Sequence, residues 1–194
     1  MYLVVGLGNP GERYTRTRHN VAWWVLDALA ARHAATEGPS DPTYRVRHCR
    51  IAGHELALLQ PLTFMNRSGE ALAAWRARQG MEQGLLVLSD DVYLPLGAMR
   101  VRESGSSGGH RGLESIETAF GGREYARLRI GVGAAESAAA LKQHVLEEFA
   151  PEEMPALEDV VRRSADCIEV WVAEGALGAM NRFNRRVRQK ETET

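Results

Sequence analysis

Short apolar runs alternate with longer stretches of helical periodicity along most of the chain. Buried strands are typically short, rich in branched aliphatic residues and bounded by glycine or polar residues. Six segments are predicted as strands: 2–7, 44–51, 54–60, 85–90, a segment that carries Arg100 and Arg102, and 127–133. The second and third segments join at Ala52-Gly53, a tight turn, and must pair antiparallel, which predicts a mixed sheet.

Between the strands, apolar residues recur at the spacing of one helix face. Asn20 can cap a helix whose apolar positions follow at i, i+3, i+4, i+7 and i+8. A second helix is expected after Asn66, and a short one after the glycine- and serine-rich segment 104–112, which should be a mobile loop. The C-terminal part is mostly helical, and Gly175 should end its long helix. This order predicts one α/β domain over residues 1–194, a twisted mixed β-sheet flanked by α-helices.

The composition is that of an ordinary globular protein. Apolar residues make up 44% of the chain and charged residues 25%. No apolar run reaches the length of about 18 residues that a membrane span needs, and the first residues lack the features of a signal peptide. The two cysteines, Cys49 and Cys167, have no metal-binding or redox spacing. We therefore expect a cytoplasmic protein with no membrane, metal or organic cofactor.

The basic residues are almost all arginine, and they are unevenly placed. Of the 24 basic residues, 22 are arginine, whose planar guanidinium binds phosphate bidentately. A nearly neutral protein with local basic patches suits a polyanion that is bound and then released. A basic tail contains Arg182, Arg185, Arg186 and Arg188. We interpret it as a solvated helix face, with RNA contact as the alternative.

A glycine-rich turn, GLGNPG at residues 6–11, follows the first predicted strand. Its Gly-x-Gly-x-x-Gly spacing is that of a dinucleotide-binding loop, which needs its third glycine in the first turn of a helix. Here Pro10 intrudes, and the best helix start, Asn20, comes nine residues after Gly11. Dinucleotide binding is therefore not expected, and the chain has neither a P-loop nor a Gly-x-Ser-x-Gly elbow.

Four polar residues stand where predicted strands end or helices begin. His19 lies near a helix N-terminus, whose positive end disfavours imidazolium and keeps a neutral base. Asp90 ends a core strand and could hold the second ring nitrogen of His19. Asn9 offers a carboxamide at a strand tip, and Asn66 is either a helix cap or a second carboxamide at the same cleft. The alternative for Asn9, His19 and Asp90 is that each is an ordinary turn or cap residue.

Longer motifs carry a family resemblance. Five occur in order: VGLGNPGERYTRTRHN, PLTFMNRSG, SDDVYLPLG, SGGHRGLESI and RLRIGVG. With the C-terminal segment EVWVAEGALGAMNRFN they resemble bacterial peptidyl-tRNA hydrolase from about residue 2 to residue 187. The RHN and TFMN segments together are highly specific, whereas the glycine loop alone is not.

The resemblance implies that the chain hydrolyses the ester joining a peptide to the 3′-terminal ribose of tRNA, which recycles tRNA from abandoned translation. It implies that His19 is a general base that activates a water, with Asp90 as its partner. The carboxamides of Asn9 and Asn66 are then the candidate donors to the oxyanion. In the family, the residue that matches Asn9 also helps to distinguish N-blocked from free aminoacyl-tRNA.

The resemblance also implies a binding surface for tRNA. Tyr14, Phe64 and Asn66 match positions that contact the acceptor end, where aromatic rings can stack bases of the single strand. Core packing is the alternative for the rings. The basic positions that grip phosphates in relatives are matched by Arg100, Arg102 and Arg129. Alternation places Arg100 and Arg102 on one strand face, and a solvated sheet face is the alternative.

The sequence departs from the family pattern in three places. Arg111 stands where relatives carry an asparagine that helps to order the water. Arginine cannot accept a hydrogen bond, so Arg111 is expected to contact the ester carbonyl or the terminal phosphate instead. Tyr93 takes the place of a second aspartate, and Ser106-Ser107 replaces part of a lid that is richer in glycine and histidine.

Two other functions remain open on the sequence alone. A family member with impaired catalysis could serve as an RNA-binding module, and Arg111 is the feature that favours it. A serine esterase could use Ser106 or Ser107 with His110, but the segment lacks the strand–turn–helix elbow of such enzymes. The favoured prediction is a monomeric enzyme that acts on the acceptor end of peptidyl-tRNA without a cofactor.

Overall fold

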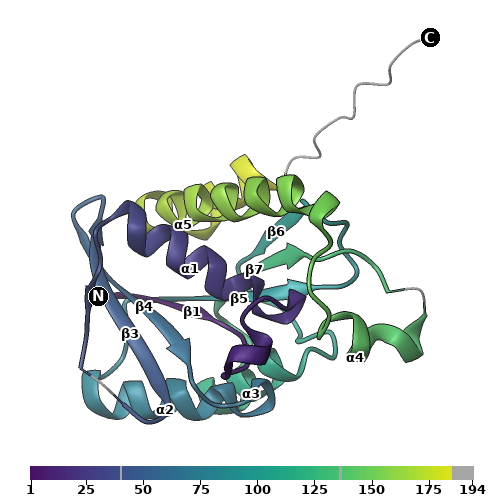
Figure 1. Cartoon of the computed structure of the whole chain (residues 1–194). Helices are drawn as coiled ribbons and strands as arrows, with labels where there is room; N and C mark the ends of the chain where they lie inside the picture. Colours follow the sequence, from purple (N-terminus) through teal and green to yellow (C-terminus); the bar gives the residue numbers. More distant parts are fainter. Residues whose placement is uncertain (40, 136, 185–194) are drawn as a thin grey trace.

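One seven-stranded sheet runs through the described part of the molecule (Figure 1). The structure is a computed structural model that describes residues 1–39, 41–135 and 137–184. The strands are β1 (Tyr2–Gly6), β2 (Thr36–Glu37), β3 (Tyr44–Ile51), β4 (His54–Pro61), β5 (Gly84–Asp91), β6 (Met99–Arg102) and β7 (Ala126–Gly131). Their order is β2-β3-β4-β1-β5-β7-β6. Strands β4, β1, β5 and β7 are parallel, whereas β2–β3, β3–β4 and β6–β7 are antiparallel pairs, so the predicted mixed α/β sheet is confirmed.

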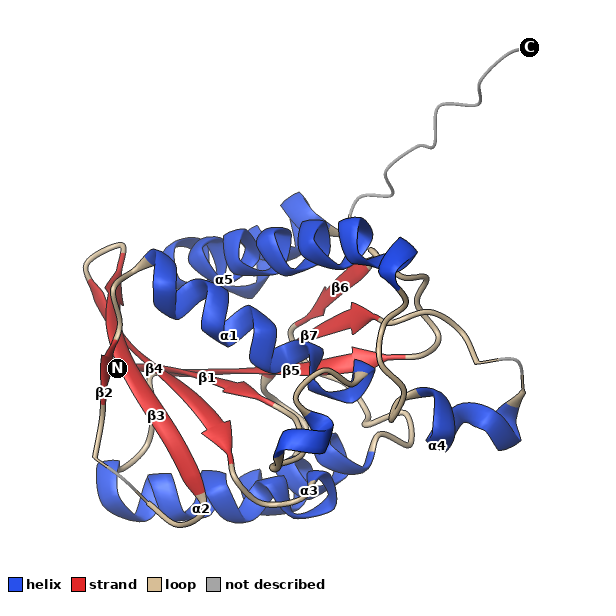
Figure 2. Ribbon diagram, viewed as in Figure 1, coloured by secondary structure: helices blue, strands red, loops and turns tan. Residues whose placement is uncertain are grey.

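Helices cover both faces of this sheet. They are α1 (Val21–Arg32), α2 (Ser68–Gln79), α3 (Arg111–Phe120), α4 (Leu141–His144) and α5 (Met154–Phe183). Helices α1 and α5 lie on one face and α2 and α3 on the other, whereas α4 lies beyond the carboxyl end of β5 (Figure 2). None of the described helices combines the length and the apolar character needed to cross a lipid bilayer.

Strand β1 is apolar along its length, and both of its faces are buried. Val4 of β1 belongs to the core that α1 and α5 form with the sheet. Its neighbours Leu3 and Val5 belong to the core on the side of α2 and α3. A strand covered on both faces has no polar alternation, which is why residues 2–7 form a continuous apolar run.

The predicted turn between β3 and β4 is confirmed. Ile51 pairs with His54 across it, so Ala52 and Gly53 form a two-residue loop. Their φ angles are 49° and 81°, and positive φ at both positions matches the right-handed twist of the flanking strands.

The glycine-rich turn brings β1 close to α1. Trp23 Nε1 donates to the carbonyl of Gly6 over 3.0 Å, and a Cβ at Gly8 would lie 2.5 Å from the Trp23 ring. After Gly11 the chain forms short 3₁₀ turns, and α1 begins only at Val21. No α-helix starts at the third glycine, which agrees with the exclusion of a dinucleotide-binding loop.

Gly175 ends the first part of the C-terminal helix, as predicted, and a second helical segment follows it. Gly175 leaves the helical conformation, with φ of 76°, but the helix resumes and continues to Phe183. The resumed part carries Ala179 into the core, and Asn184 fixes its end by two hydrogen bonds, of 2.8 and 3.0 Å, to the backbone of Val101. The break at Gly175 therefore follows the local preference of glycine, and tertiary packing holds the helical segment that follows it.

The basic tail is described only at its start. Arg182 is exposed and pairs with Glu174 at 2.5 Å, as expected of a solvated helix face. Arg185, Arg186 and Arg188 lie outside the described residues.

Candidate active site

A cavity of about 440 Å³ opens where β5 ends. Its walls come from the segment after β1, the turn before α2, the end of β5, the start of α3 and α4. Ten of the residues predicted for the site or for departures from the family line it: Asn9, Tyr14, His19, Phe64, Asn66, Asp90, Tyr93, Ser107, Arg111 and Arg129. The carboxyl ends of parallel strands are where α/β sheets place their binding sites.

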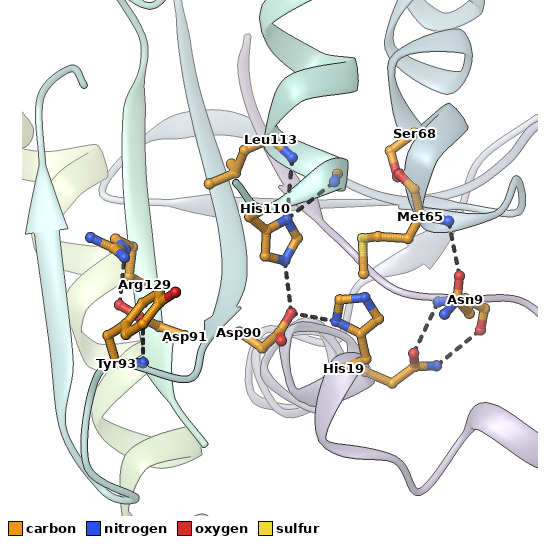
Figure 3. A network of polar contacts seen from close by, with 12 residues as sticks. Asn9, His19, Met65, Ser68, Asp90, Asp91, Tyr93, His110, Leu113 and Arg129 are labelled. Atoms are coloured by element: carbon orange, nitrogen blue, oxygen red, sulfur yellow. Dashed lines mark hydrogen bonds and ion pairs between the residues drawn. The ribbon is translucent and has the colours of Figure 1, made fainter. Parts of the chain in front are cut away.

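His19 and Asp90 meet at the floor of this cavity (Figure 3). His19 lies in a 3₁₀ turn before α1, and its Nδ1 is 2.7 Å from Oδ1 of Asp90 at the end of β5. An ionised carboxylate only accepts, so Nδ1 carries the proton and Nε2 keeps a free lone pair. The predicted pairing of the two side chains is therefore present.

The backbone of His19 is held from the opposite wall. Its N–H donates to the carbonyl of Val145 over 2.8 Å, just beyond α4. Its neighbour Arg18 is buried and pairs with Glu153, with 2.6 Å between Nη2 and Oε2, while its guanidinium lies over the Phe149 ring. These contacts hold His19 where the segment before α1 packs against residues 145–153. The sequence did not predict them.

His110 is a second imidazole on Asp90, and sequence reasoning assigned it only to a disfavoured alternative. Its Nε2 is 2.8 Å from the same Oδ1 (Figure 3). Its Nδ1 accepts the backbone N–H groups of Gly112 and Leu113 at 3.1 and 3.3 Å, so His110 is the N-cap of α3. Histidine is an unusual cap. The only signal in the sequence was its position directly before the helix.

The hydrogen bonds fix the tautomer of His110. Because Nδ1 accepts two N–H groups, Nε2 must carry the proton that it donates to Asp90. Neither nitrogen then has a lone pair free to activate Ser106 or Ser107. The serine esterase alternative is therefore wrong for this geometry.

The same tautomer bears on metal binding. His19, Asp90 and His110 each offer a ligand atom, and these atoms lie within 4.8 Å of one another. A metal at this point would need a lone pair on Nε2 of His110, so the proton on Nε2 would have to move to Nδ1. The N–H at Nδ1 would then face the backbone N–H groups of Gly112 and Leu113, which need an acceptor. The donor set therefore fits a hydrogen-bonded triad better than a metal site.

Burial and charge shift both pKa values in this triad. Burial alone would lower the pKa of His19, but the Asp90 carboxylate, through its charge and its hydrogen bond, raises it above the ordinary value. Burial alone would raise the pKa of Asp90, but the two imidazoles hold it well below its usual range. Asp90 therefore stays ionised beside His19.

Asn20 stands at the N-cap position of α1, as predicted, but its side chain holds Asn9 and does not bond to the helix. Its carboxamide accepts from the backbone N–H of Asn9 at 2.9 Å and donates to the carbonyl of Asn9 at 3.0 Å. Asn20 is fully buried, and a buried carboxamide must satisfy both ends, which this pair of bonds does. Its side chain makes no cap hydrogen bond to α1.

The orientation of the Asn9 side chain follows from one contact. Its Oδ1 accepts the backbone N–H of Met65 at 2.9 Å, which assigns the oxygen and leaves the amide nitrogen without a partner among the described residues. Asn9 lines the cavity, so this nitrogen is a donor available to a ligand there.

Asn66 is a cleft residue and not a helix cap. It lies in the 3₁₀ turn Met65–Arg67, two residues before α2 begins at Ser68, and makes no cap hydrogen bond. It is exposed and lines the cavity. Of the two alternatives left open by the sequence, the second carboxamide holds.

Tyr14 and Phe64 form an aromatic edge to the cavity. Their ring centroids are 6.4 Å apart and the rings are nearly perpendicular, at 89°. Phe64 is 51% exposed, so the core-packing alternative fails for this ring. The guanidinium of Arg13 lies over the Tyr14 ring, 4.6 Å from its centroid.

Three of the predicted basic residues lie on neighbouring strands. Arg100 and Arg102 are exposed on β6, and Arg100 is directly opposite Arg129 of β7. Residues directly opposite in an antiparallel pair share a face. Arg129 Nε lies 2.9 Å from Asp91 Oδ2, an ion pair in which the N–H is not aimed at the oxygen. Arg129 is thus held by protein, whereas Arg100 and Arg102 have no ion-pair or hydrogen-bond partner among the described residues.

The departures from the family pattern face the same cavity. Arg111 opens α3, is exposed, and makes no hydrogen bond or ion pair with any residue that the structure describes. Tyr93 is 71% exposed beside Arg129 (Figure 3). The glycine- and serine-rich loop is tied down at Ser106, whose carbonyl accepts from the buried Arg127 at 3.0 Å.

Comparisons with known proteins agree with this geometry. A family model described as peptidyl-tRNA hydrolase matches residues 3–193. A peptidyl-tRNA hydrolase from Chloroflexus aggregans is 44% identical over 186 residues, 95% of this chain and 99% of that protein. One from Syntrophomonas wolfei is 43% identical over 187 residues, 95% of this chain and all of that protein. The crystal structure of peptidyl-tRNA hydrolase from Acinetobacter baumannii, 32% identical, superposes with a TM-score of 0.87 over 95% of this chain and 94% of the other.

Proposed function

The chain belongs to the peptidyl-tRNA hydrolase family, and from this premise we propose how its cleft carries out the reaction. The protein hydrolyses peptidyl-tRNA at the ester between peptide and tRNA. The observation that carries the proposed mechanism is the 2.7 Å contact between His19 Nδ1 and Asp90, which leaves Nε2 free beside the cavity.

His19 is the general base. Its Nε2 takes a proton from a water molecule as the water oxygen bonds to the ester carbonyl carbon. The tetrahedral intermediate then expels the terminal ribose oxygen, which takes the proton back from the imidazolium. Asp90 stays ionised throughout and stabilises the imidazolium, and the second donor, His110, keeps its pKa low. The reaction needs no serine or cysteine nucleophile.

The carboxamides of Asn9 and Asn66 are the donors to the developing oxyanion. The hydrogen bond from Met65 to Asn9 Oδ1 orients the carboxamide, and its amide nitrogen has no partner among the described residues. A donor that is already held in place, as Asn9 is, costs no reorganisation when charge develops. A neutral amide also favours a blocked amino group, since a free ammonium would leave a hydrogen bond mismatched at this position.

The tRNA lies across the aromatic edge and the basic strands. Tyr14 and Phe64 stack bases of the single-stranded acceptor end. Arg100 and Arg102 contact phosphates, and their lack of an ion-pair partner in the described part of the chain supports this role. Arg129 is a weaker candidate because a phosphate must compete with Asp91 for it.

Arg111 binds the terminal phosphate of the acceptor end. It lines the catalytic cavity with a guanidinium that no described residue neutralises. An unpaired guanidinium at a cleft that receives a polyanion gains most from a bidentate phosphate contact.

Three further proposals concern the whole chain. Residues 1–194 form one domain, which the single sheet shared by the described strands supports. The enzyme acts as a monomer, because one copy supplies all the residues assigned to the reaction. It works in the cytoplasm, where its substrate is made and where Cys49 and Cys167 stay reduced.

The test is incubation of the purified protein with N-acetyl-aminoacyl-tRNA. We expect stoichiometric release of free tRNA and N-acetyl-amino acid, and turnover beyond one equivalent. A protein that only bound RNA would protect the ester, and that result would contradict the mechanism.

A further inference from the structure

Arg127 of β7 is a buried arginine outside the catalytic cavity, and only 1% of it is exposed. Its guanidinium lies over the Tyr125 ring, with Cζ 4.4 Å from the ring centroid. Nη1 is 3.5 Å from the carboxylate of Glu117 on α3, and Nε has no hydrogen-bond partner among the described residues. Glu117 is also paired with Arg123, at 3.1 Å, so one acid faces two cations. The charge of Arg127 is therefore incompletely neutralised.

The stability of the fold does not explain this arginine. Arg102 stands directly opposite Arg127 in the β6–β7 pair, and like charges at opposite positions repel each other. A buried ionic group is often no more stabilising than an apolar side chain of similar volume. Replacing Arg127 with methionine would leave Glu117 paired with Arg123, so no acid would lose its last partner.

The guanidinium holds the loop that leads to α3. Nη1 of Arg127 donates to the carbonyl of Ser106 over 3.0 Å, and Nη2 donates to the carbonyl of Arg123 over 3.2 Å. Within the part of the chain that the structure describes, no other hydrogen bond ties residues 103–109 to the rest of the protein. Hydrogen bonds from a charged donor are stronger than those between neutral groups. Arg127 is thus the anchor of this loop.

The anchor point, Ser106, lies four residues before His110. Between them, the carbonyl of Ser107 accepts the N–H of His110 at 3.2 Å, and Ser107 Oγ accepts the N–H of Gly109 at 3.3 Å. A short hydrogen-bonded turn therefore joins the anchor to the imidazole. The same turn lines the catalytic cavity. Movement of Ser106 would displace both this wall and the second donor to Asp90.

We propose that Arg127 is a positioning residue for the hydrolysis, which holds the loop 103–109 against the sheet so that His110 reaches Asp90. The inference rests on the proposed function of the cleft and adds a residue that acts on it from beneath the loop. Arg127 acts through His110, which holds the carboxylate that pairs with His19. Loss of the anchor lowers the fraction of molecules with an assembled site, and activity falls with that fraction.

Arg127→Met tests the proposal, and Arg123→Met is the matched control. Arg123 is exposed and pairs with the same glutamate, but its side chain makes no hydrogen bond to the loop. We expect kcat/KM for N-acetyl-aminoacyl-tRNA to fall about tenfold in Arg127→Met, the effect of losing one hydrogen bond from a charged donor. The control should keep native activity, and both melting temperatures should stay close to native. Equal losses in the two variants, or native activity in a folded Arg127→Met, would overturn the proposal.

The pH profile distinguishes positioning from a general loss of stability. Displacing His110 leaves Asp90 with one donor fewer, so the acid limb of kcat/KM should move upwards in Arg127→Met, as in His110→Asn. In the double variant the limb should lie where it lies in His110→Asn alone, because both changes act through one imidazole. A limb that stays in place in Arg127→Met, or that moves further in the double variant, would contradict the proposal.

Hydrogen exchange supplies a readout that needs no substrate. The amides of Gly112 and Leu113 donate to His110 Nδ1, so they are protected while the loop is held in place. In Arg127→Met they should exchange about tenfold faster, whereas the amides of β1 and β5 keep native protection. Unchanged exchange at Gly112 and Leu113 would overturn the proposal.

A second variant keeps the test independent of the methionine substitution. Arg127→Gln keeps a polar group at the buried position but is too short to reach Ser106, so it should show the same loss of activity and the same faster exchange. A folded Arg127→Gln with native kcat/KM would overturn the proposal. Absence of hydrolysis by the native protein would instead defeat the proposed function, and with it the catalytic role of Arg127, so the two failures are distinguishable.

Discussion

His19 and His110 donate to the same oxygen of Asp90, at 2.7 and 2.8 Å, although they come from opposite sides of the cleft. One imidazole has its second nitrogen free beside the cavity, whereas the second nitrogen of the other is occupied by the start of α3. The two rings are chemically alike, and their hydrogen bonds assign them different tasks. In the proposed mechanism His19 exchanges a proton, whereas His110 holds the carboxylate.

Removing His110 should change how His19 titrates. His110→Asn can still cap α3, but its shorter side chain does not reach Asp90. The carboxylate then loses a donor and interacts more strongly with His19, whose pKa rises further. We expect kcat to fall about tenfold at neutral pH, with the acid limb of the pH–rate profile displaced upwards and the melting temperature close to native. The control is His48→Asn on β3, and a fall in kcat with no displaced limb would reduce His110 to a purely structural role.

The activity of the native enzyme should be lost on acidification at a pH above the ordinary histidine pKa. His19 must be neutral to act as a base, and Asp90 raises its pKa. The raised pKa also means that the pair stabilises the fold fully below the unfolded-state pKa and loses that contribution as pH rises through the folded value. In Asp90→Asn the limb should move to lower pH while kcat falls. The measurement is the pH dependence of kcat/KM for the native protein and for Asp90→Asn. If the acid side of the profile lies at the same pH in both, Asp90 does not set the pKa of His19.

Replacing Arg100 should weaken tRNA binding through charge. Arg100→Ala removes one phosphate contact, so the slope of log Kd against log salt concentration should become shallower by about one. Arg45 of β3 is ion-paired with Glu37 away from the cleft, and Arg45→Ala is the control. The measurement is a titration of catalytically inactive protein with tRNA at several salt concentrations. Parallel slopes for the two variants would place Arg100 away from the phosphates.

Replacing Arg111 should affect binding more than chemistry. Arg111→Ala is expected to raise KM for N-acetyl-aminoacyl-tRNA about tenfold and to leave kcat within about threefold, because a phosphate contact is made equally in ground and transition states. Arg111→Asn restores the residue type that the family pattern leads one to expect. Steady-state kinetics of both variants would show the split, and a fall in kcat at constant KM would assign Arg111 to the reacting carbonyl.

The sequence predicted the features of the fold that depend on local patterns of apolar and polar residues. The runs that became β1 and β5 are buried on both faces, and the start of α1 is marked by its periodicity. The placement of His19 near Asp90 followed from strand and helix ends together with the family motifs. Each of these rests on residues that lie close together in the chain or on a general rule for parallel sheets.

The remaining features depend on contacts between distant segments. Asn20 looks like a helix cap, but its side chain turns back to hold Asn9 across the glycine turn. His110 contacts Asp90 only because α3 begins beside the end of β5. The helical segment after Gly175 is held by Ala179 in the core and by the hydrogen bonds of Asn184 to Val101. The ion pair between Arg129 and Asp91 likewise joins neighbouring strands whose pairing no local pattern specifies.

The most direct test of the account is the turnover of His19→Ala on N-acetyl-aminoacyl-tRNA. General-base catalysis contributes about 10²–10⁴ in rate, so kcat should fall by that factor. Affinity for tRNA should change little, because the imidazole contacts the water and not the phosphates. A His19→Ala enzyme that keeps kcat within about tenfold of the native value, while folded and bound to tRNA, would contradict the assignment of the base.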